Sequence, residues 1–211
     1  MKKNNGVFLI LGVLFFLNIF AWIAIYDLSQ PKFLEVTFFD VGQGDAIFIE
    51  TPQGHQILID GGPSSVILEK LAKEMPFWDR SIDLIILSHP EHDHFAGLLP
   101  VLERYEVDYI LWTGVVRDTN EYREWKELIE QEKAKIKIAK AGQKIKLTEN
   151  IHLDILHPFE NLEGQEIKNS NNTSIINLLV FGQHSWLFTG DAYKSVEKNL
   201  LKEIPISQPT F

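Results

Sequence analysis

The chain has 211 residues, of which 45% are hydrophobic and 23% are charged, so it suits one globular domain with an appendage and is neither disordered nor fibrous. Its 20 basic and 29 acidic residues give a net charge of −9, which argues against a protein that coats nucleic acid. The absence of cysteine excludes disulfide scaffolds, cysteine zinc fingers, iron–sulfur clusters and thiol nucleophiles. Any bound metal must therefore use His, Asp, Glu or Asn as ligands.

The first predicted element is an uncharged stretch over residues 6–26, and about 20 such residues span a bilayer as a helix. Lysines at positions 2 and 3 favour a cytoplasmic N-terminus. We therefore predict a single-pass membrane anchor over residues 1–30, with the following domain on the extracytoplasmic side of the cell membrane. A cleaved signal peptide is the competing interpretation, although its apolar core normally has about 7–15 residues and residues 26–29 make a poor cleavage site.

Residues 31–211 alternate between strand and helix patterns, which favours a layered α/β domain. Strands are predicted at 33–39, 46–50, 56–59, 82–87, 109–113, 135–139, 151–156, 175–181 and 186–188, and helices at 66–74, 95–104, 120–132 and 193–203. The apolar run at 82–87 is typical of a strand that is buried on both faces. Lysines at 133, 135 and 137 alternate with apolar residues, which indicates a charged edge strand; a stripe that faces phosphates is the alternative.

The segment at residues 88–97 (SHPEHDHFAG) directly follows this buried strand. Between positions 89 and 94 it holds three histidines and two acids, a dense set of metal-ligand side chains. Imidazole suits zinc, iron or manganese, and the admixture of carboxylates favours harder divalent ions. The segment therefore predicts a metal or catalytic site, with a solvated polar loop as the alternative.

Five motifs follow one another along the chain: FDVGQGDA at 39–46, LIDGG at 58–62, the histidine segment, NNTS at 171–174 and FTGDA at 188–192. In this order they resemble the motifs of the metallo-β-lactamase superfamily, and more closely those of the extracytoplasmic domain of ComEC-type competence proteins. The resemblance covers about residues 33–192 and implies a four-layer αββα sandwich. The family continues beyond the last motif to a further histidine ligand, so we expect the domain at 31–211 to be incomplete at its C-terminus. A fragment of a longer protein is the favoured explanation, and a shortened gene product is the alternative.

The resemblance also implies a dinuclear hydrolase that holds two divalent ions, manganese or zinc. Its metal ligands would be His89, Glu91, Asp93, His94 and Asp191, with Asp191 bridging the two ions. Catalytic roles would fall to Asp93, to Asp60 as the residue that orients a ligand, and to Asn172. Asp40, Gln43 and Asp45 would approach the substrate, although a polar β-turn explains these three residues nearly as well.

The sequence departs from the superfamily pattern at two further places. Glu91 stands where the superfamily has its second histidine, which shifts the preference toward manganese or magnesium. His92 is expected to point to solvent, with a role as the substitute ligand as the alternative. An asparagine pair, Asn171 and Asn172, follows Ser170 where a distal histidine would be. His157 is expected on the surface.

The function that the resemblance implies is a phosphodiesterase or nuclease that acts on DNA during uptake, in partnership with a competence channel. A hydrolase of the same fold that cleaves another ester or phosphoester is one alternative. A catalytically inactive, membrane-anchored binding domain is the other. Substitution of Asp93 or Asp191 by Ala distinguishes the enzymes from the inactive domain.

Overall fold

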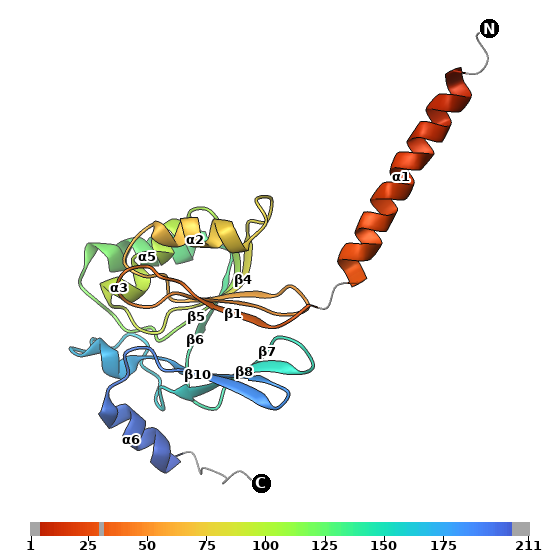
Figure 1. Ribbon diagram of the computed structural model, residues 1–211. Helices are drawn as coiled ribbons and strands as arrows, with labels where there is room; N and C mark the ends of the chain where they lie inside the picture. Colours follow the sequence, from red (N-terminus) through yellow and green to blue (C-terminus); the bar gives the residue numbers. More distant parts are fainter. Residues whose placement is uncertain (1–4, 30–31, 204–211) are drawn as a thin grey trace. The chain divides into compact units, whose positions relative to one another are not determined.

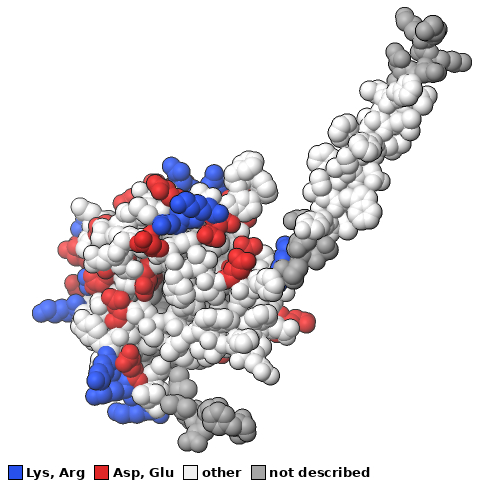
Figure 2. All heavy atoms as spheres, viewed as in Figure 1, with Lys and Arg blue, Asp and Glu red and all other residues white. Residues whose placement is uncertain are grey.

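The computed structural model describes residues 5–29 and 32–203, and it divides the chain into two units, Met1–Phe33 and Leu34–Phe211. The first unit contains helix α1 (Asn5–Ser29). Among the described residues α1 is the one helix long and apolar enough to cross a membrane, a property that an N-terminal signal sequence shares. Its side chains over Gly6–Ile23 are not buried within the protein, and the space-filling view shows a column of uncharged atoms (Figure 2).

The second unit is built on two sheets. The first sheet has the order β1-β2-β3-β4-β5-β6, with antiparallel pairing from β1 to β3 and parallel pairing from β3 to β6. Its strands are β1 (Glu35–Phe38), β2 (Ile47–Glu50), β3 (Gln56–Ile59), β4 (Ser81–Ile86), β5 (Glu106–Trp112) and β6 (Lys135–Ile138). The second sheet is antiparallel throughout, with the order β10-β9-β8-β7. Its strands are β7 (Lys144–Lys146), β8 (Ile151–His157), β9 (Ile176–Phe181) and β10 (His184–Phe188).

Helices flank the two sheets. They are α2 (Val66–Glu74), α3 (His92–Phe95), α4 (Leu98–Leu102), α5 (Asn120–Gln131) and α6 (Lys194–Glu203), with a 3-10 turn, η1, at Ser170–Thr173. Figure 1 shows α2, α3 and α5 over the outer face of the first sheet, the second sheet against its inner face, and α6 beyond the second sheet. This layering of helices and two sheets confirms the predicted α/β sandwich.

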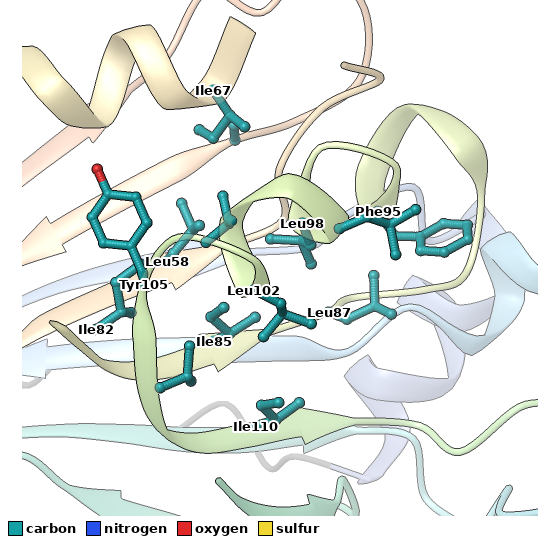
Figure 3. Close-up of a cluster of buried hydrophobic side chains, with 14 of the residues drawn as sticks. Leu58, Ile67, Ile82, Ile85, Leu87, Phe95, Leu98, Leu102, Tyr105 and Ile110 are labelled. Carbon is teal, nitrogen blue, oxygen red and sulfur yellow. The ribbon is translucent and has the colours of Figure 1, made fainter. Parts of the chain in front are cut away.

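Two buried clusters explain why the layers hold together. Alternate residues of a strand point to opposite faces, so Leu58 packs under the helices while Ile57 and Ile59 pack between the sheets. All three are at most 2% exposed, and full burial of such a side chain contributes roughly 1.5–3 kcal/mol. Figure 3 shows the cluster under the helices, where side chains of α3 and α4 such as Phe95 and Leu98 meet those of the first sheet.

Most predicted elements are present, with a few informative differences. The helix expected at 95–104 is interrupted, because α3 starts within the histidine segment and α4 begins after Gly97. Gly97 lies against the backbone of Gly61, where a Cβ atom would collide. Strand β5 begins at Glu106 rather than at 109, and β7 was not predicted. Strand β6 lies at the edge of the first sheet with exposed lysines, as expected.

Candidate metal centre

The residues of the predicted site gather where strands of the first sheet end. Asp60 directly follows β3, and His89 comes three residues after the end of β4. These strands are parallel, so their carboxyl ends meet at the same edge of the sheet. His94 lies in α3, and Asp191 follows β10 from the second sheet. The two sheets therefore converge on one cluster from distant parts of the sequence.

Asp60 is the centre of the hydrogen-bond network in this cluster. Its carboxylate accepts bonds from the Ser88 backbone N (2.7 Å), the Ser88 Oγ (2.6 Å) and the His94 Nδ1 (2.9 Å). The Asp60 side chain is only 2% exposed, and its backbone adopts a positive φ of 57°, a region that Asp tolerates better than most residues. Asp60 thus fixes the imidazole of His94 and directs its Nε2 away from the network.

The hydrogen bonds of the Ser88 hydroxyl also determine which ring nitrogen of His89 carries the proton. Because that hydroxyl donates its single proton to Asp60, it must accept at 3.0 Å from the Nδ1–H of His89. The neutral ring of His89 then carries a lone pair on Nε2. The two imidazole rings of His89 and His94 lie 4.2 Å apart between centroids, and both Nε2 atoms are buried without a hydrogen-bond partner.

A buried nitrogen without a partner is costly, so a ligand for these two atoms is expected. The His94 Nε2 lies 3.5 Å from Asp191 Oδ1, and donor atoms of His89, His94 and Asp191 all fall within 4.8 Å of one another. Asp45, Asp60 and His94 form a second group that meets the same distance limit. Two imidazole nitrogens with carboxylate oxygens are a donor set that suits zinc, iron or manganese, so the residues present fit a divalent metal ion.

The charged groups of the cluster and their burial shift the pKa values of three of its residues. Burial lowers the pKa of His94, but the hydrogen bond and the charge of Asp60, with smaller contributions from Asp191 and Asp45, outweigh burial and raise the pKa to about 9. Burial, reinforced by the neighbouring His94, lowers the pKa of His89. Burial also raises the pKa of Asp45, with Asp60 and Asp191 acting in the same direction and His94 opposing. Without metal, the raised pKa therefore favours the protonated imidazolium form of His94 at neutral pH, with a proton on each ring nitrogen.

Two of the predicted ligands contact other partners instead. The Glu91 Oε1 accepts a hydrogen bond from Arg117 Nη2 at 3.0 Å and also contacts the Ser170 hydroxyl. The Asp93 Oδ2 accepts a bond from the Gln43 Nε2 at 3.2 Å. The structure thus brings together three of the five predicted ligands and leaves Glu91 and Asp93 paired beside them. Their roles as ligands stay predictions.

The first hairpin turn approaches the same cluster. Asp40 accepts a bond from the backbone N of Gly42 at 3.2 Å, within its own turn, whereas Gln43 reaches Asp93 and Asp45 lies in the second donor group. Gly44 has a positive φ of 70° and packs directly on the backbone of Asp93, so no side chain fits there. The turn and the histidine segment are therefore held in contact.

The two residues of the asparagine pair make different contacts. Asn171 donates to Asp191 Oδ2 at 3.4 Å, whereas Asn172, the residue predicted to be catalytic, accepts a long bond from Ser195 at 3.5 Å. His92 is exposed, as expected, and contacts Glu121.

The surface expectation for His157 is wrong. Its ring is buried, and its Nδ1 donates to the carbonyl oxygen of Ser174 at 2.9 Å. Period-2 alternation along β8 would have found this, because Ile151, Leu153 and Ile155 point to the same side. By contrast, Arg117 lies 26 residues from its partner Glu91 and carries no local sequence signal.

A two-sheet sandwich with helices outside and a His/Asp cluster at the sheet edge defines a class of protein. The sequence model of the metallo-β-lactamase superfamily matches residues 39–203, and the chain belongs to this superfamily. Its members are generally hydrolases, and the fold typically binds divalent metals such as zinc or iron.

The chain is also similar to individual proteins of known sequence or structure. It is 25% identical over 189 residues to ComE operon protein 3 of Bacillus subtilis (strain 168), and the aligned region covers 81% of this chain and 24% of that protein. It thus spans about a quarter of the length of this relative. Among solved structures it resembles the metallo-β-lactamase SMB-1, with a TM-score of 0.50, 16% identity, and coverage of 81% of this chain and 73% of that one. A metallo-β-lactamase from Staphylococcus aureus subsp. aureus COL gives a TM-score of 0.49 and 20% identity over 76% of this chain and 44% of that chain.

Proposed function

We propose that the chain is a membrane-anchored, metal-dependent hydrolase that cleaves phosphodiester bonds of DNA during uptake. The observation that carries this proposal is the pair of buried Nε2 atoms, on His89 and His94, which converge with Asp191 and have no hydrogen-bond partner. Similarity to ComE operon protein 3 supports the link with competence and makes DNA the proposed substrate. A competence or DNA-uptake channel is the proposed partner.

His89, His94 and Asp191 would hold the metal ions, and Glu91 and Asp93 would join them after exchanging their present partners. We propose two divalent ions, manganese or zinc. When bound, such a pair supplies Lewis acidity toward a phosphoryl oxygen and an ionised water at neutral pH.

The remaining residues of the site would orient the metal ligands, hold protons or contact the substrate. Asp60 holds the Nδ1–H of His94, so that Nε2 is presented as a ligand once His94 has lost its proton. Gln43 would fix Asp93, and the half-buried carboxyl of Asp45 would lie toward the substrate with Asp40. Asn172, or its neighbour Asn171 beside Asp191, would donate to a phosphate oxygen.

Helix α1 would anchor the chain in the cell membrane through residues 6–26 and leave the domain on the extracytoplasmic side. Its apolar length supports the anchor, and the two lysines before it support the orientation. A domain outside the cytoplasm would meet incoming DNA before it crosses the membrane.

The test is DNA cleavage by the full chain in detergent micelles or lipid nanodiscs, with manganese or zinc added. We expect Asp191→Asn to lower the rate of cleavage at least ~100-fold. Loss of a residue that only hydrogen-bonds a metal ligand already lowers metal affinity or activity about 10–100-fold, and Asp191 is a proposed ligand itself. Asp118→Asn is the matched control, since the Asp118 side chain is 87% exposed and pairs only with Arg123 in the described structure. Equal rates for both variants would contradict the proposal, whereas cleavage of a simple phosphodiester without cleavage of DNA would favour another substrate.

The pairing of Glu91 with Arg117 favours one alternative, a binding domain without activity. If metal and DNA bind but no phosphodiester is cleaved, this alternative holds. Arg117→Gln would then remove the ion pair, while Glu91 keeps its contact with the Ser170 hydroxyl, and would serve as the direct check of whether that ion pair blocks the site.

A further inference from the structure

The turn between α2 and β4 exposes two large aromatic side chains. Phe77 is 80% exposed and Trp78 is 72% exposed, and their rings contact each other edge to face with centroids 4.8 Å apart. They occupy the two central positions of a tight turn that is closed by the Asp79 backbone N donating to Pro76 O at 2.9 Å. Such positions usually hold Gly, Pro, Asn, Asp or Ser, so an exposed Phe-Trp pair at the tip requires an explanation.

The turn is held rigidly on the sheet. The Asp79 Oδ1 accepts bonds from the backbone N and the hydroxyl of Ser81, at 3.1 and 2.8 Å, while its Oδ2 accepts from Gln56 Nε2 at 2.9 Å. Met75, on the other side of the turn, is buried in the core. The two aromatic rings are therefore presented outward by a fixed backbone.

The end of the sheet that carries this turn is the end where the chain enters the second unit. Glu35, the first residue of β1, pairs with Glu50, and Glu50 pairs with Gln56 at the start of β3. Strand β4 runs parallel to β3 from Ser81, so its start lies at the same end. Figure 1 shows the yellow turn before β4 and the beginning of β1 at this common end.

The sequence gives this end a short tether to the proposed anchor. Only four residues separate Ser29, the last residue of α1, from Leu34, a span of at most about 18 Å when fully extended. Phe33, within the tether, is also 67% exposed. Tryptophan and other aromatic side chains favour the interface between lipid headgroups and acyl chains.

We propose that Phe77 and Trp78 insert into the membrane interface and orient the domain on the bilayer. The inference rests on the proposed anchoring of α1. Two aromatic side chains alone hold a protein on a membrane weakly, but a short tether raises the effective concentration of the turn at the surface to the millimolar range. Lys73 and Arg80 are exposed beside Glu74, so the local charge is mixed and apolar contact with zwitterionic lipid supplies the attraction.

This orientation has a consequence for the metal centre. Asp60 and His89 follow the opposite ends of β3 and β4, and the six residues of β4 alone span ~20 Å. The centre then faces away from the lipid, toward material arriving from the extracytoplasmic side.

The test uses the natural absence of cysteine, which allows a single fluorescent label at a chosen position of the full chain. The variants are Trp78→Cys at the turn, Trp22→Cys in α1 and Asp118→Cys at the opposite end of the domain, each in phosphatidylcholine vesicles. Quenchers are a lipid with a nitroxide near its headgroup and a water-soluble iodide. Phe77→Cys repeats the measurement at the neighbouring position.

We expect lipid quenching at Trp78→Cys and Trp22→Cys to be at least about twofold stronger than at Asp118→Cys, which iodide should quench instead. Lipid quenching at Trp22→Cys without any at the turn would overturn the proposal and leave the anchor intact. Absence of lipid quenching at Trp22→Cys would overturn both. A label at the turn that neither quencher reaches would indicate a protein contact there and would also overturn the proposal.

Discussion

Replacement of Asp60 by Asn tests the electrostatic account of the metal centre. The change keeps the side-chain shape and suits the positive φ of 57°, but it removes the charge that faces His94. The pKa of His94, about 9 with Asp60 present, should then fall toward its ordinary value, because the two largest contributions that oppose burial come from Asp60 and only the smaller ones of Asp191 and Asp45 remain. At pH 7.5 the protonated fraction of His94 would fall from ~97% toward about 10%.

The consequence is a difference in proton release. A metal ligand must be deprotonated, so metal binding at pH 7.5 should release about one proton from His94 in the natural protein and ~0.1 in Asp60→Asn. Calorimetric titration in two buffers of different ionisation enthalpy measures this number directly. Protons lost from other groups are common to both proteins and cancel in the comparison. The metal affinity itself should fall by about 10–100-fold, because the imidazole loses its orienting acceptor. Equal proton release from both proteins would refute the assignment of Asp60 as the residue that sets the protonation of His94.

Three further predictions concern stability. The pKa of His94 is raised in the folded state, so its contribution is fully present below about pH 6.5 and is lost toward pH 9; the free energy of unfolding of the metal-free protein, measured with urea and a chelator, should therefore decrease across that window. Gly97→Ala should lower the free energy of unfolding by about 1–3 kcal/mol, because its Cβ would collide with the Gly61 backbone, and an unchanged urea midpoint would contradict this packing. His157→Ala should cost about 1–3 kcal/mol in the same assay by leaving the Ser174 carbonyl unpaired, whereas a neutral effect would mean that water replaces the ring.

The sequence predicted the layers of the fold because most strands carry their own pattern of apolar residues. A continuous apolar run marked β4 as a strand buried on both faces, and the motifs that follow β3 and β4 marked Asp60 and His89. Strand β7 carried no such signal, since its three residues are Lys144, Ile145 and Lys146. It exists because it pairs with β8, which is a tertiary effect.

The sequence predicted the site residues that directly follow the ends of strands. It did not predict which side chains contact one another within the site. Glu91 lies in the predicted segment, but its pairing with Arg117 depends on a loop that approaches from 26 residues away. The geometry of the turn η1 decides which of two adjacent amides faces Asp191, and that amide belongs to Asn171, while the catalytic role of Asn172 stays a prediction. The spacing of motifs in the sequence thus locates the segments of the site, whereas the contacts of individual side chains depend on the folded structure.

The metal content of the purified full chain is the most direct test of the central claim. After incubation with manganese or zinc and removal of free ions, elemental analysis should find two ions per chain, and fewer in His89→Ala and Asp191→Ala. Asp118→Ala, which lies outside the cluster, should retain the full content. A chain that holds no ion, or one whose metal content is unchanged by loss of His89 and Asp191, would contradict the assignment of this cluster as a metal centre.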